Sequence, residues 1–340
     1  MSQRPRIIID RDIPFLRGRL EHAAECVYAG QHEFTPELVR DADALIIRTR
    51  TRCDRALLEG SRVRFIATAT IGMDQFDLDW CRSAGITVRN APGCNAPGVA
   101  QYVWSALLRA GFDPARHTLA LVGRGNVGSV VAEWGRALGA RILVSDPPRA
   151  AQGFTDEDYR PLHEIIAQAD AVTLHTPYTR TGPHPTHHLI GAPEIALMRP
   201  GAILLNAARG PVADGDAIKS ALTEGRIRAI IDTWEGEPDI DPELVPLAET
   251  ATCHIAGYSA EGKQRATRMA LENVAQFFGF DIDTSGLAPA YVPENPPSAE
   301  AILASYDPAH DTALLRQQPE LFEQLRSDYD FRHEPLTSKE

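Results

Sequence analysis

Short apolar runs, rich in β-branched residues, alternate with amphipathic stretches along most of the chain. The runs that predict strands are residues 6–10, 44–49, 64–70, 87–90, 118–123, 141–146, 171–176, 202–208 and 229–234. Stretches with helical spacing lie between them, for example at 35–43, 54–60 and 77–85. This alternation is typical of right-handed βαβ units around parallel sheets. Because these strands are too many for one small sheet, we expect an α/β fold with two Rossmann-like, doubly wound parallel-sheet domains.

Two long helices mark the expected boundary between the domains. The segment 90–112 begins as a Pro- and Gly-rich loop and continues from Val99 as an apolar helix, which would carry the chain into the second sheet. A second long helix is predicted at 259–279. The expected parts are residues 1–95 with 256–285 for the first domain, 96–255 for the second, and 286–340 for a short C-terminal segment.

Composition places the chain among ordinary globular proteins and excludes some partners. It has 340 residues, 44% of them hydrophobic, and a formal net charge of −12. Because a protein this acidic has no large basic field, we expect no nucleic-acid partner and no membrane partner. No apolar run is long enough to span a bilayer. Five cysteines form no CxxC pair and leave one over in any disulfide scheme, so we expect reduced thiols and a cytoplasmic protein.

A glycine motif predicts a dinucleotide site in the second domain. Gly123, Gly125 and Gly128 form G-x-G-x-x-G directly after a predicted strand and at the start of a predicted helix. The glycines allow a tight turn and close approach of a pyrophosphate, whose charge the helix amino terminus favours. The next predicted strand ends in Asp146, where a carboxylate accepts hydrogen bonds from a ribose and repels a 2′-phosphate. This favours NAD over NADP, although nearby Arg149 could serve NADP, and a glycine turn without a nucleotide is the alternative.

A second group of residues supplies the parts of one reaction. Arg209 and Asp232 lie at or just past the carboxyl ends of predicted strands, and Glu237 and His254 follow. An arginine binds a carboxylate with two hydrogen bonds, and a histidine can exchange a hydroxyl proton while hydride leaves the same carbon. A neighbouring glutamate would orient the imidazole and stabilise its protonated form. Taken singly, each residue could equally be a surface or structural group.

In this ordered set the chain resembles the D-isomer-specific 2-hydroxyacid dehydrogenases, up to about Gly279. The motifs that carry the resemblance are ATATIGMDQFD, NAPGCNAPGVAQYV, SDPPRA, HTPYTRTGPHPTHHLI, DTWEGEPDI and HIAGYSAEGK. It implies an NAD-dependent oxidoreductase whose first domain binds the substrate and whose second domain binds NAD. The implied catalytic residues are Arg209, Glu237 and His254. The implied NAD contacts are Gly123, Gly125, Asn126, Val127, Gly128, Asp146, Thr176, Asp232 and Gly257, and the implied substrate contacts are Thr49, Thr70 and Tyr258.

Within that family the chain looks like the branch whose substrate is a small phosphorylated 2-hydroxyacid. The segment YDPAHDTALLRQQPELFEQLR resembles the C-terminal dimerisation segment of this branch. Residues from about Ala299 are too few to bury a core of their own, so we expect them to pack in a symmetric homodimer.

Three arginines at alternating positions raise the question of the phosphate. Arg48, Arg50 and Arg52 lie on one face if the strand persists, whereas a turn after Thr49 would bring Arg48 and Thr49 to the ligand together. Because Arg209 serves the carboxylate of the implied substrate, we expect Arg48 to bind the phosphate at the other end. For Arg50 and Arg52, pairing with the surplus acids is an equal alternative.

Two other functions stay open. The chain could be a dehydrogenase for another D-2-hydroxyacid, such as 3-phosphoglycerate or glycerate, or a dinucleotide-sensing binding protein of the same fold. His184, His187 and His188 could suggest a metal, but no recognisable ligand pattern accompanies them, so we expect none. Cys94 lacks an evident base and is expected to be a structural thiol.

Overall fold

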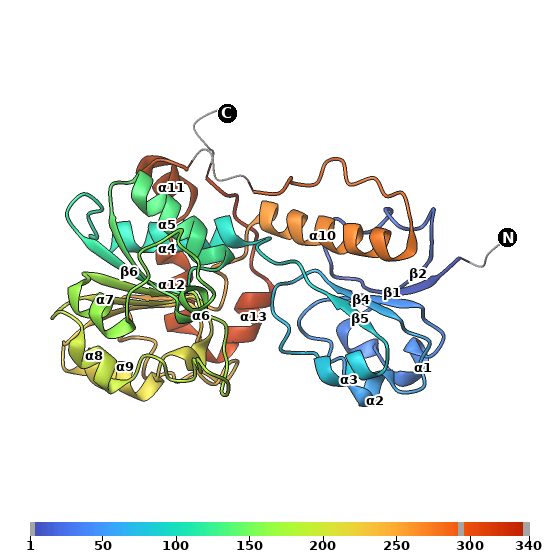
Figure 1. Cartoon of the computed structure of the whole chain (residues 1–340), viewed down its shortest axis with the longest axis horizontal. Helices are drawn as coiled ribbons and strands as arrows, with labels where there is room; N and C mark the ends of the chain where they lie inside the picture. Colours follow the sequence, from blue (N-terminus) through green and yellow to red (C-terminus); the bar gives the residue numbers. More distant parts are fainter. Residues whose placement is uncertain (1–3, 292–295, 336–340) are drawn as a thin grey trace. The chain divides into compact units, whose positions relative to one another are not determined.

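The computed structural model describes residues 4–291 and 296–335, and the chain divides into two compact units (Figure 1). Unit 1 comprises Met1–Asn95 and Ala260–Tyr291, and unit 2 comprises Ala96–Ser259 and Val292–Glu340. The chain therefore enters unit 2 after Asn95, returns to unit 1 in α10 (Ala260–Phe278) and enters unit 2 a second time after Tyr291. Unit 1 is therefore discontinuous in sequence, and its second part begins at Ala260, whereas the sequence-based expectation placed that start at residue 256.

Unit 1 is built on a five-stranded parallel sheet in the order β2-β1-β3-β4-β5. Its strands are β1 (Arg6–Asp10), β2 (Glu25–Ala29), β3 (Ala44–Ile47), β4 (Phe65–Thr68) and β5 (Thr87–Arg89). Its other elements are η1 (Gln31–Glu33), α1 (Pro36–Val39), α2 (Arg55–Leu58), α3 (Leu78–Ser83) and α10. The chain order reverses at β1, which has β2 on one side and β3 on the other.

Both faces of this sheet are covered, which explains why its strands read as continuous apolar runs. Ile7 and Ile9 of β1 pack into a cluster with Ala270 and Val274 of α10. Ile8, between them, points to the other face and joins the cluster of the short helices α1 and α2. Successive residues of one strand thus stabilise opposite layers.

Unit 2 contains a six-stranded parallel sheet in the order β11-β10-β9-β8-β6-β7. Its strands are β6 (Thr118–Val122), β7 (Arg141–Ser145), β8 (Ala171–Leu174), β9 (Ile203–Asn206), β10 (Arg228–Ile231) and β11 (Thr250–Ala251). Its other elements up to β11 are α4 (Ala96–Arg109), α5 (Asn126–Ala137), α6 (Pro147–Ala151), α7 (Leu162–Gln168), α8 (Ala192–Leu197), η2 (Gly210–Val212) and α9 (Gly215–Thr223).

The register of unit 2 brings the carboxyl ends of its central strands to one edge. Val122 pairs with Ser145 of β7 and Leu174 of β8, and Leu174 pairs with Asn206 of β9. The chain order reverses at β6, and ligands of open α/β sheets bind at the carboxyl edge beside such a reversal. Residues that directly follow these strands therefore gather where a dinucleotide site is expected.

The tail belongs to unit 2 over its described residues. It forms α11 (Ala299–Ser305), α12 (Ala309–Gln317), η3 (Pro319–Leu321) and α13 (Phe322–Ser327). Leu315 and Phe322 are almost fully buried in the main hydrophobic cluster of unit 2. The predicted separate segment 286–340 is thus divided: residues up to 291 lie in unit 1, while 296–335 pack on unit 2, because their apolar side chains complete its core.

Each predicted strand run became a strand, and two strands were not predicted. β2 begins with a glutamate and has only one buried residue, and β11 has two residues, so neither gives an apolar run. Of the two alternatives for the arginine run, a persisting strand and a turn after Thr49, the structure has a turn, but it comes earlier: β3 ends at Ile47 and the turn lies at Thr49 and Arg50.

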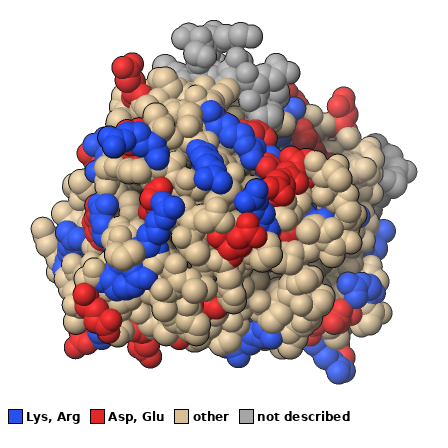
Figure 2. Space-filling model, turned by 60° about the vertical axis from the view of Figure 1, so that its left-hand side comes forward, with Lys and Arg blue, Asp and Glu red and all other residues tan. Residues whose placement is uncertain are grey.

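The surface and the thiols complete this description. On the face drawn in Figure 2, Lys and Arg side chains lie interspersed with Asp and Glu. None of the five cysteines, all of which lie among the described residues, forms a disulfide bond. Among the described residues, no helix has both the length and the apolar character that crossing a membrane demands.

Candidate active site

The glycine loop forms a close-packed turn between β6 and α5. Gly123 has φ +95°, a conformation that favours glycine. A Cβ at Gly128 would stand 2.0 Å from the Gly123 carbonyl oxygen, so no side chain fits there. Gly125 is the N-cap of the twelve-residue α5 and makes no side-chain cap. The amino end of α5 thus keeps the backbone donors and dipole that favour an anion.

Asp146 follows β7 beside this loop and is partly exposed. Its Oδ2 accepts a hydrogen bond from the Arg124 N–H at 2.7 Å, and its Oδ1 accepts one from the Arg149 N–H at 3.0 Å. A carboxylate oxygen can accept more than one hydrogen bond, so Asp146 keeps capacity for ribose hydroxyls. The Arg149 side chain binds Tyr159 and Asp156 and lies over the Phe154 ring. These contacts occupy the arginine that could have served a 2′-phosphate.

Thr176 follows β8 at the carboxyl edge of the unit 2 sheet, and its hydroxyl group supports a dinucleotide site there. Its hydroxyl oxygen is buried and has no hydrogen-bond partner among the described residues. Buried polar atoms are seldom left without a partner, so an orphan beside the glycine loop indicates a ligand group. The glycine turn, Asp146 and Thr176 together fit NAD.

His254 and Glu237 form a direct pair in unit 2. The distance from His254 Nδ1 to Glu237 Oε2 is 2.7 Å, and Glu237 Oε1 accepts a hydrogen bond from the Trp234 N–H at 2.7 Å. Burial raises the pKa of Glu237, but the His254 charge and hydrogen bond, the Trp234 N–H and the Arg326 charge together lower it below its ordinary value. Glu237 is therefore an ionised carboxylate that fixes one imidazole nitrogen and leaves the other for a substrate.

Asp232 holds the loop that carries His254. The His254 N–H donates to the Asp232 carbonyl, and the Asp232 carboxylate accepts from the N–H groups of Ile255 and Ala256 and from the Thr252 hydroxyl. Asp232 is only 1% exposed. These bonds hold His254 at φ 59°, in the left-handed region. The structure thus gives Asp232 a positioning task, and its predicted contact with NAD stays a prediction.

Arg209 lies on the loop after β9, next to the loop that carries Glu237. Asn206, which sequence reasoning missed, donates to the carbonyls of Arg209 and Gly210 and accepts from the Ala208 N–H. A Cβ at Gly210 would stand 1.8 Å from the Trp234 carbonyl oxygen, so glycine is required for the two loops to touch. A polar residue within the predicted buried strand run 202–208 was the signal that could have found Asn206.

The predicted substrate residues are divided between the units. Tyr258 lies in unit 2, four residues after His254, with Gly257 before it. In unit 1, Thr49 is exposed in the turn after β3, and the Thr70 hydroxyl lies 2.6 Å from that of Thr68.

Arg48 is engaged in an ion pair that the sequence did not predict. Its Nε lies 2.7 Å from Asp10 Oδ2, and its Nη2 lies 3.1 Å from Asp10 Oδ1 and 2.7 Å from Asp12 Oδ2. The Asp10 side chain is fully buried, so Arg48 compensates a buried charge beside the reversal of the unit 1 sheet. Its contact with a phosphate stays a prediction. Arg52 pairs with Asp54 at the exposed strand end, as one alternative anticipated.

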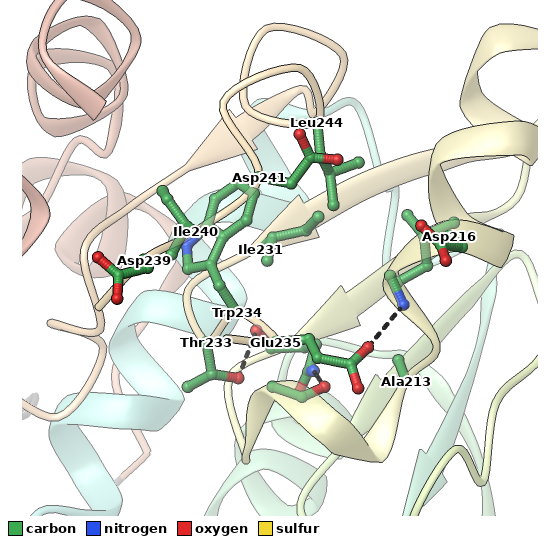
Figure 3. Close-up of a pocket in the computed structure, with 14 residues that line it drawn as sticks. Ala213, Asp216, Ile231, Thr233, Trp234, Glu235, Asp239, Ile240, Asp241 and Leu244 are labelled. Carbon is green, nitrogen blue, oxygen red and sulfur yellow. Dashed lines mark hydrogen bonds between the residues drawn. The ribbon is translucent and has the colours of Figure 1, made fainter. Parts of the chain in front are cut away.

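A cavity of ≈350 Å³ in unit 2 borders the loop that carries Arg209, because Asn206 and Gly210 line it (Figure 3). Its lining includes Trp234, Ile240 and the carboxylates of Glu235 and Asp239, but none of the predicted site residues. Glu235 accepts a hydrogen bond from the Gly215 N–H, which fixes the wall of the cavity. The cavity therefore adjoins the loops of Arg209 and Glu237, although neither of these two residues lines it.

Of the three histidines considered for a metal, one lies in a cluster with two acids. His188 Nε2 lies 2.8 Å from Glu235 Oε1, and His188 Nδ1 lies 3.6 Å from Asp214 Oδ2. Asp214 also caps α9. His188 and Glu235 thus share a hydrogen bond, and the Asp214 carboxylate lies beside them.

The fold and the site define an NAD-dependent dehydrogenase. Residues 89–259 match the family described as "D-isomer specific 2-hydroxyacid dehydrogenase, NAD binding domain". This match spans half of the chain, and the chain belongs to the D-isomer specific 2-hydroxyacid dehydrogenases. Unit 2 contains the NAD-binding domain.

A curated relative and two solved structures narrow the comparison. The chain is 45% identical over 340 residues to the erythronate-4-phosphate dehydrogenase of Bacteroides fragilis, with 97% of each chain covered. The TT0316 protein of Thermus thermophilus has a similar structure, with a TM-score of 0.67, 27% identity and 81% of this chain and 98% of that chain covered. The NAD⁺-bound 3-phosphoglycerate dehydrogenase of Entamoeba histolytica has a TM-score of 0.68 at 24% identity, with 85% and 99% covered. This last likeness concerns the fold alone.

Proposed function

We propose that this chain oxidises 4-phospho-D-erythronate to 2-oxo-3-hydroxy-4-phosphobutanoate with NAD, a step in pyridoxal 5′-phosphate biosynthesis. The observation that carries the proposal is the 2.7 Å pair of His254 and Glu237 in a chain 45% identical, almost end to end, to an erythronate-4-phosphate dehydrogenase. The reaction needs a proton acceptor at the C2 hydroxyl and a cation at the neighbouring carboxylate. His254 and Arg209 have the chemistry for these two tasks.

His254 takes the proton of the C2 hydroxyl through the imidazole nitrogen that does not face Glu237. Glu237 stabilises the positive charge that develops on the ring, because an ionised carboxylate in hydrogen-bond contact favours the imidazolium. Arg209 binds the substrate carboxylate and polarises the C2 oxygen. NAD, when bound, accepts the hydride that leaves C2.

The remaining assignments follow the family resemblance. Thr49, Thr70 and Tyr258 offer hydroxyl groups to the substrate, and Arg48 offers a cation to its phosphate. Gly257 and Asp232 are proposed to contact NAD, in addition to the glycine loop, Asp146 and Thr176. A partly exposed Asp146 supports recognition of the adenosine ribose.

We also propose that the protein acts as a cytoplasmic homodimer. The lack of a disulfide bond among the five described cysteines supports a reducing compartment. Leu314, Leu321 and Leu325 of the tail remain partly exposed on unit 2, which supports a contact with a second copy.

A substrate panel tests the proposed reaction. NADH absorbance should rise with 4-phospho-D-erythronate and much less with D-erythronate, 3-phosphoglycerate or glycerate, because the phosphate supplies part of the binding free energy. A higher kcat/KM with 3-phosphoglycerate or glycerate would assign the chain to another 2-hydroxyacid. NAD binding without turnover of any panel member would favour a dinucleotide-sensing protein.

A further inference from the structure

The loop that carries His254 is held from two sides. We call residues 254–259 the catalytic loop. On one side, the buried Asp232 carboxylate accepts hydrogen bonds from the N–H groups of Ile255 and Ala256. Within the loop, the Ile255 and Gly257 carbonyls accept from the N–H groups of Tyr258 and Ser259, and further donors to the loop carbonyls come from outside it.

Those donors come from the tail, about 75 residues later in the chain. Arg332 Nη1 donates to the Ile255 carbonyl at 2.9 Å and to the Tyr258 carbonyl at 3.3 Å, and Nη2 donates to the Ala256 carbonyl. One guanidinium therefore binds three carbonyl groups of the catalytic loop. A planar group with five N–H donors can do this, whereas a lysine ammonium cannot match the same fork.

Arg332 is itself fixed by residues outside the catalytic loop. Its Nε donates to Gln101 Oε1 at 2.9 Å, and its Nη2 donates to the Gly98 carbonyl at 3.1 Å, both on α4. The guanidinium lies over the Tyr306 ring, 4.3 Å from its centroid. Because α4 and Tyr306 fix the Arg332 side chain, its guanidinium can hold the catalytic loop in a defined position relative to α4.

Two further contacts join the tail to the same loop. Glu334 Oε1 accepts a hydrogen bond from the Ser259 hydroxyl at 2.7 Å, and the backbones of Ser259 and Arg332 form a parallel bridge. Arg326 Nε donates to the Tyr258 hydroxyl at 3.3 Å. The tail therefore contacts the catalytic loop from Ile255 to its end.

We propose that Arg332 is a positioning residue for the dehydrogenation, which keeps His254 and Tyr258 in their reactive places by binding the carbonyl groups between them. The proposal rests on the proposed role of His254 and gives the tail a task inside its own subunit. A misplacement of about 1 Å in a reacting group can cost on the order of 100-fold in rate. Loss of the Arg332 contacts should therefore lower kcat.

The test compares Arg332→Lys with a matched control in the same tail. Arg316 also binds carbonyl oxygens of unit 2, those of Ala248 and Glu249, but it touches no residue of the catalytic loop. Arg332→Lys should lower kcat by roughly 10- to 100-fold and leave the Kd of ADP-ribose unchanged, since Asp146 and the glycine loop bind that part. Arg316→Lys should keep the kcat of the unsubstituted enzyme.

Amide hydrogen exchange gives a readout that does not depend on activity. In Arg332→Lys, exchange of the amides of residues 255–258 should become faster, while Arg316→Lys should leave it unchanged. Normal exchange and normal kcat in Arg332→Lys would overturn the proposal, and so would equal losses in the two variants. The failure of the proposed reaction can be told apart from this. If the unsubstituted protein does not oxidise the substrate, but loop exchange is faster in Arg332→Lys and not in Arg316→Lys, the proposed reaction is wrong and the positioning contact of Arg332 is still supported.

Chemical rescue separates positioning from general stability. In Arg332→Ala, added methylguanidinium should restore part of the lost kcat, because the small cation can occupy the vacated donor position between the carbonyl groups. Arg316→Ala should show no response to it. A folded Arg332→Ala enzyme that stays equally slow with and without methylguanidinium would contradict the proposal. If Arg332→Ala does not fold, the Arg332→Lys comparison decides.

Discussion

The backbone conformation and the side-chain contact of His254 together decide which substitution tests its role. The backbone lies at φ 59°, where asparagine is tolerated better than alanine, and the imidazole faces Glu237 at 2.7 Å. His254→Asn therefore removes the proton acceptor with less backbone strain than His254→Ala. We expect kcat to fall by about 10²- to 10⁴-fold with little change in NAD affinity.

Stopped-flow or steady-state NADH absorbance measures the rate, and titration calorimetry with NAD measures the affinity. His163→Asn is a matched control, because His163 is exposed on α7 and pairs with Glu194 rather than with a predicted site residue. Near-normal turnover in His254→Asn would show that another group takes the proton.

Arg48 shows how one side chain can have two tasks. Removal of Arg48 leaves the fully buried Asp10 carboxylate without its partner, so Arg48→Ala should lower the free energy of unfolding by about 3 kcal/mol. Arg52→Ala should change it by less than about 0.5 kcal/mol, because Arg52 is 83% exposed. Urea unfolding measures both.

The phosphate task of Arg48 is measured separately, by KM. If Arg48 also binds phosphate, KM for 4-phospho-D-erythronate should rise by about 10- to 150-fold in Arg48→Ala, with little change for D-erythronate. Equal increases for both substrates would leave Arg48 as a structural partner of Asp10, and the phosphate would need another cation.

At the level of single residues, the sequence could indicate which residues have the chemistry for a site, but not which residues contact one another in the fold. The glycine spacing and Asp146 predicted a nucleotide edge because their positions relative to predicted strands carry meaning. The Asp10–Arg48 pair joins residues 38 positions apart, and Arg332 lies 77 positions from Ile255. Such pairings depend on the tertiary fold, and no local pattern contains them.

Arg124 of the glycine loop forms an ion pair with Glu157, which also pairs with Arg136. Glu157 is 7% exposed at its side chain and binds Arg124 Nε at 2.8 Å and Arg136 Nη2 at 2.5 Å. Burial raises the pKa of Glu157, but the two arginines lower it below its ordinary value. Glu157→Gln should lower the free energy of unfolding at pH 7 by about 2 kcal/mol.

This difference should depend on pH in a defined direction. Because the folded pKa of Glu157 lies below the unfolded value of 4.5, its contribution is complete above pH 4.5 and is lost as pH falls through the folded pKa. The two proteins should therefore converge in stability at acid pH when urea unfolding is repeated there. Asp158→Asn, at a 75% exposed carboxylate, should have little effect at either pH. A Glu157→Gln effect that is absent at pH 7 would contradict a stabilising pair.

Elements with strong apolar patterns were predictable, and elements defined by pairing were not. β1 and β6 are buried over nearly their whole length and read directly from the sequence. β2 has mixed burial and exists because it pairs with β1 from Arg6 to Asp10. The tail helices were assigned from their apolar positions to contacts with another subunit, but Leu315 and Phe322 are used by unit 2 itself.

The whole molecule combines two parallel-sheet units with one extra segment on unit 2. Arg209, Glu237, His254 and the nucleotide edge all lie in unit 2, while Arg48, Thr49 and Thr70 lie in unit 1. Each of the two long helices starts at a boundary between the units, α4 at Ala96 and α10 at Ala260. The assignment of the tail to unit 2 required the packing of its side chains.

Transfer of deuterium from C2 tests the central claim most directly. The substrate is 4-phospho-D-erythronate carrying deuterium at C2, and the reduced nicotinamide is examined by NMR after turnover. The account predicts one deuterium on one face of the reduced ring in the unsubstituted enzyme, at a rate that falls with His254→Asn. Reduced cofactor without deuterium, or no reduced cofactor at all, would contradict oxidation at C2.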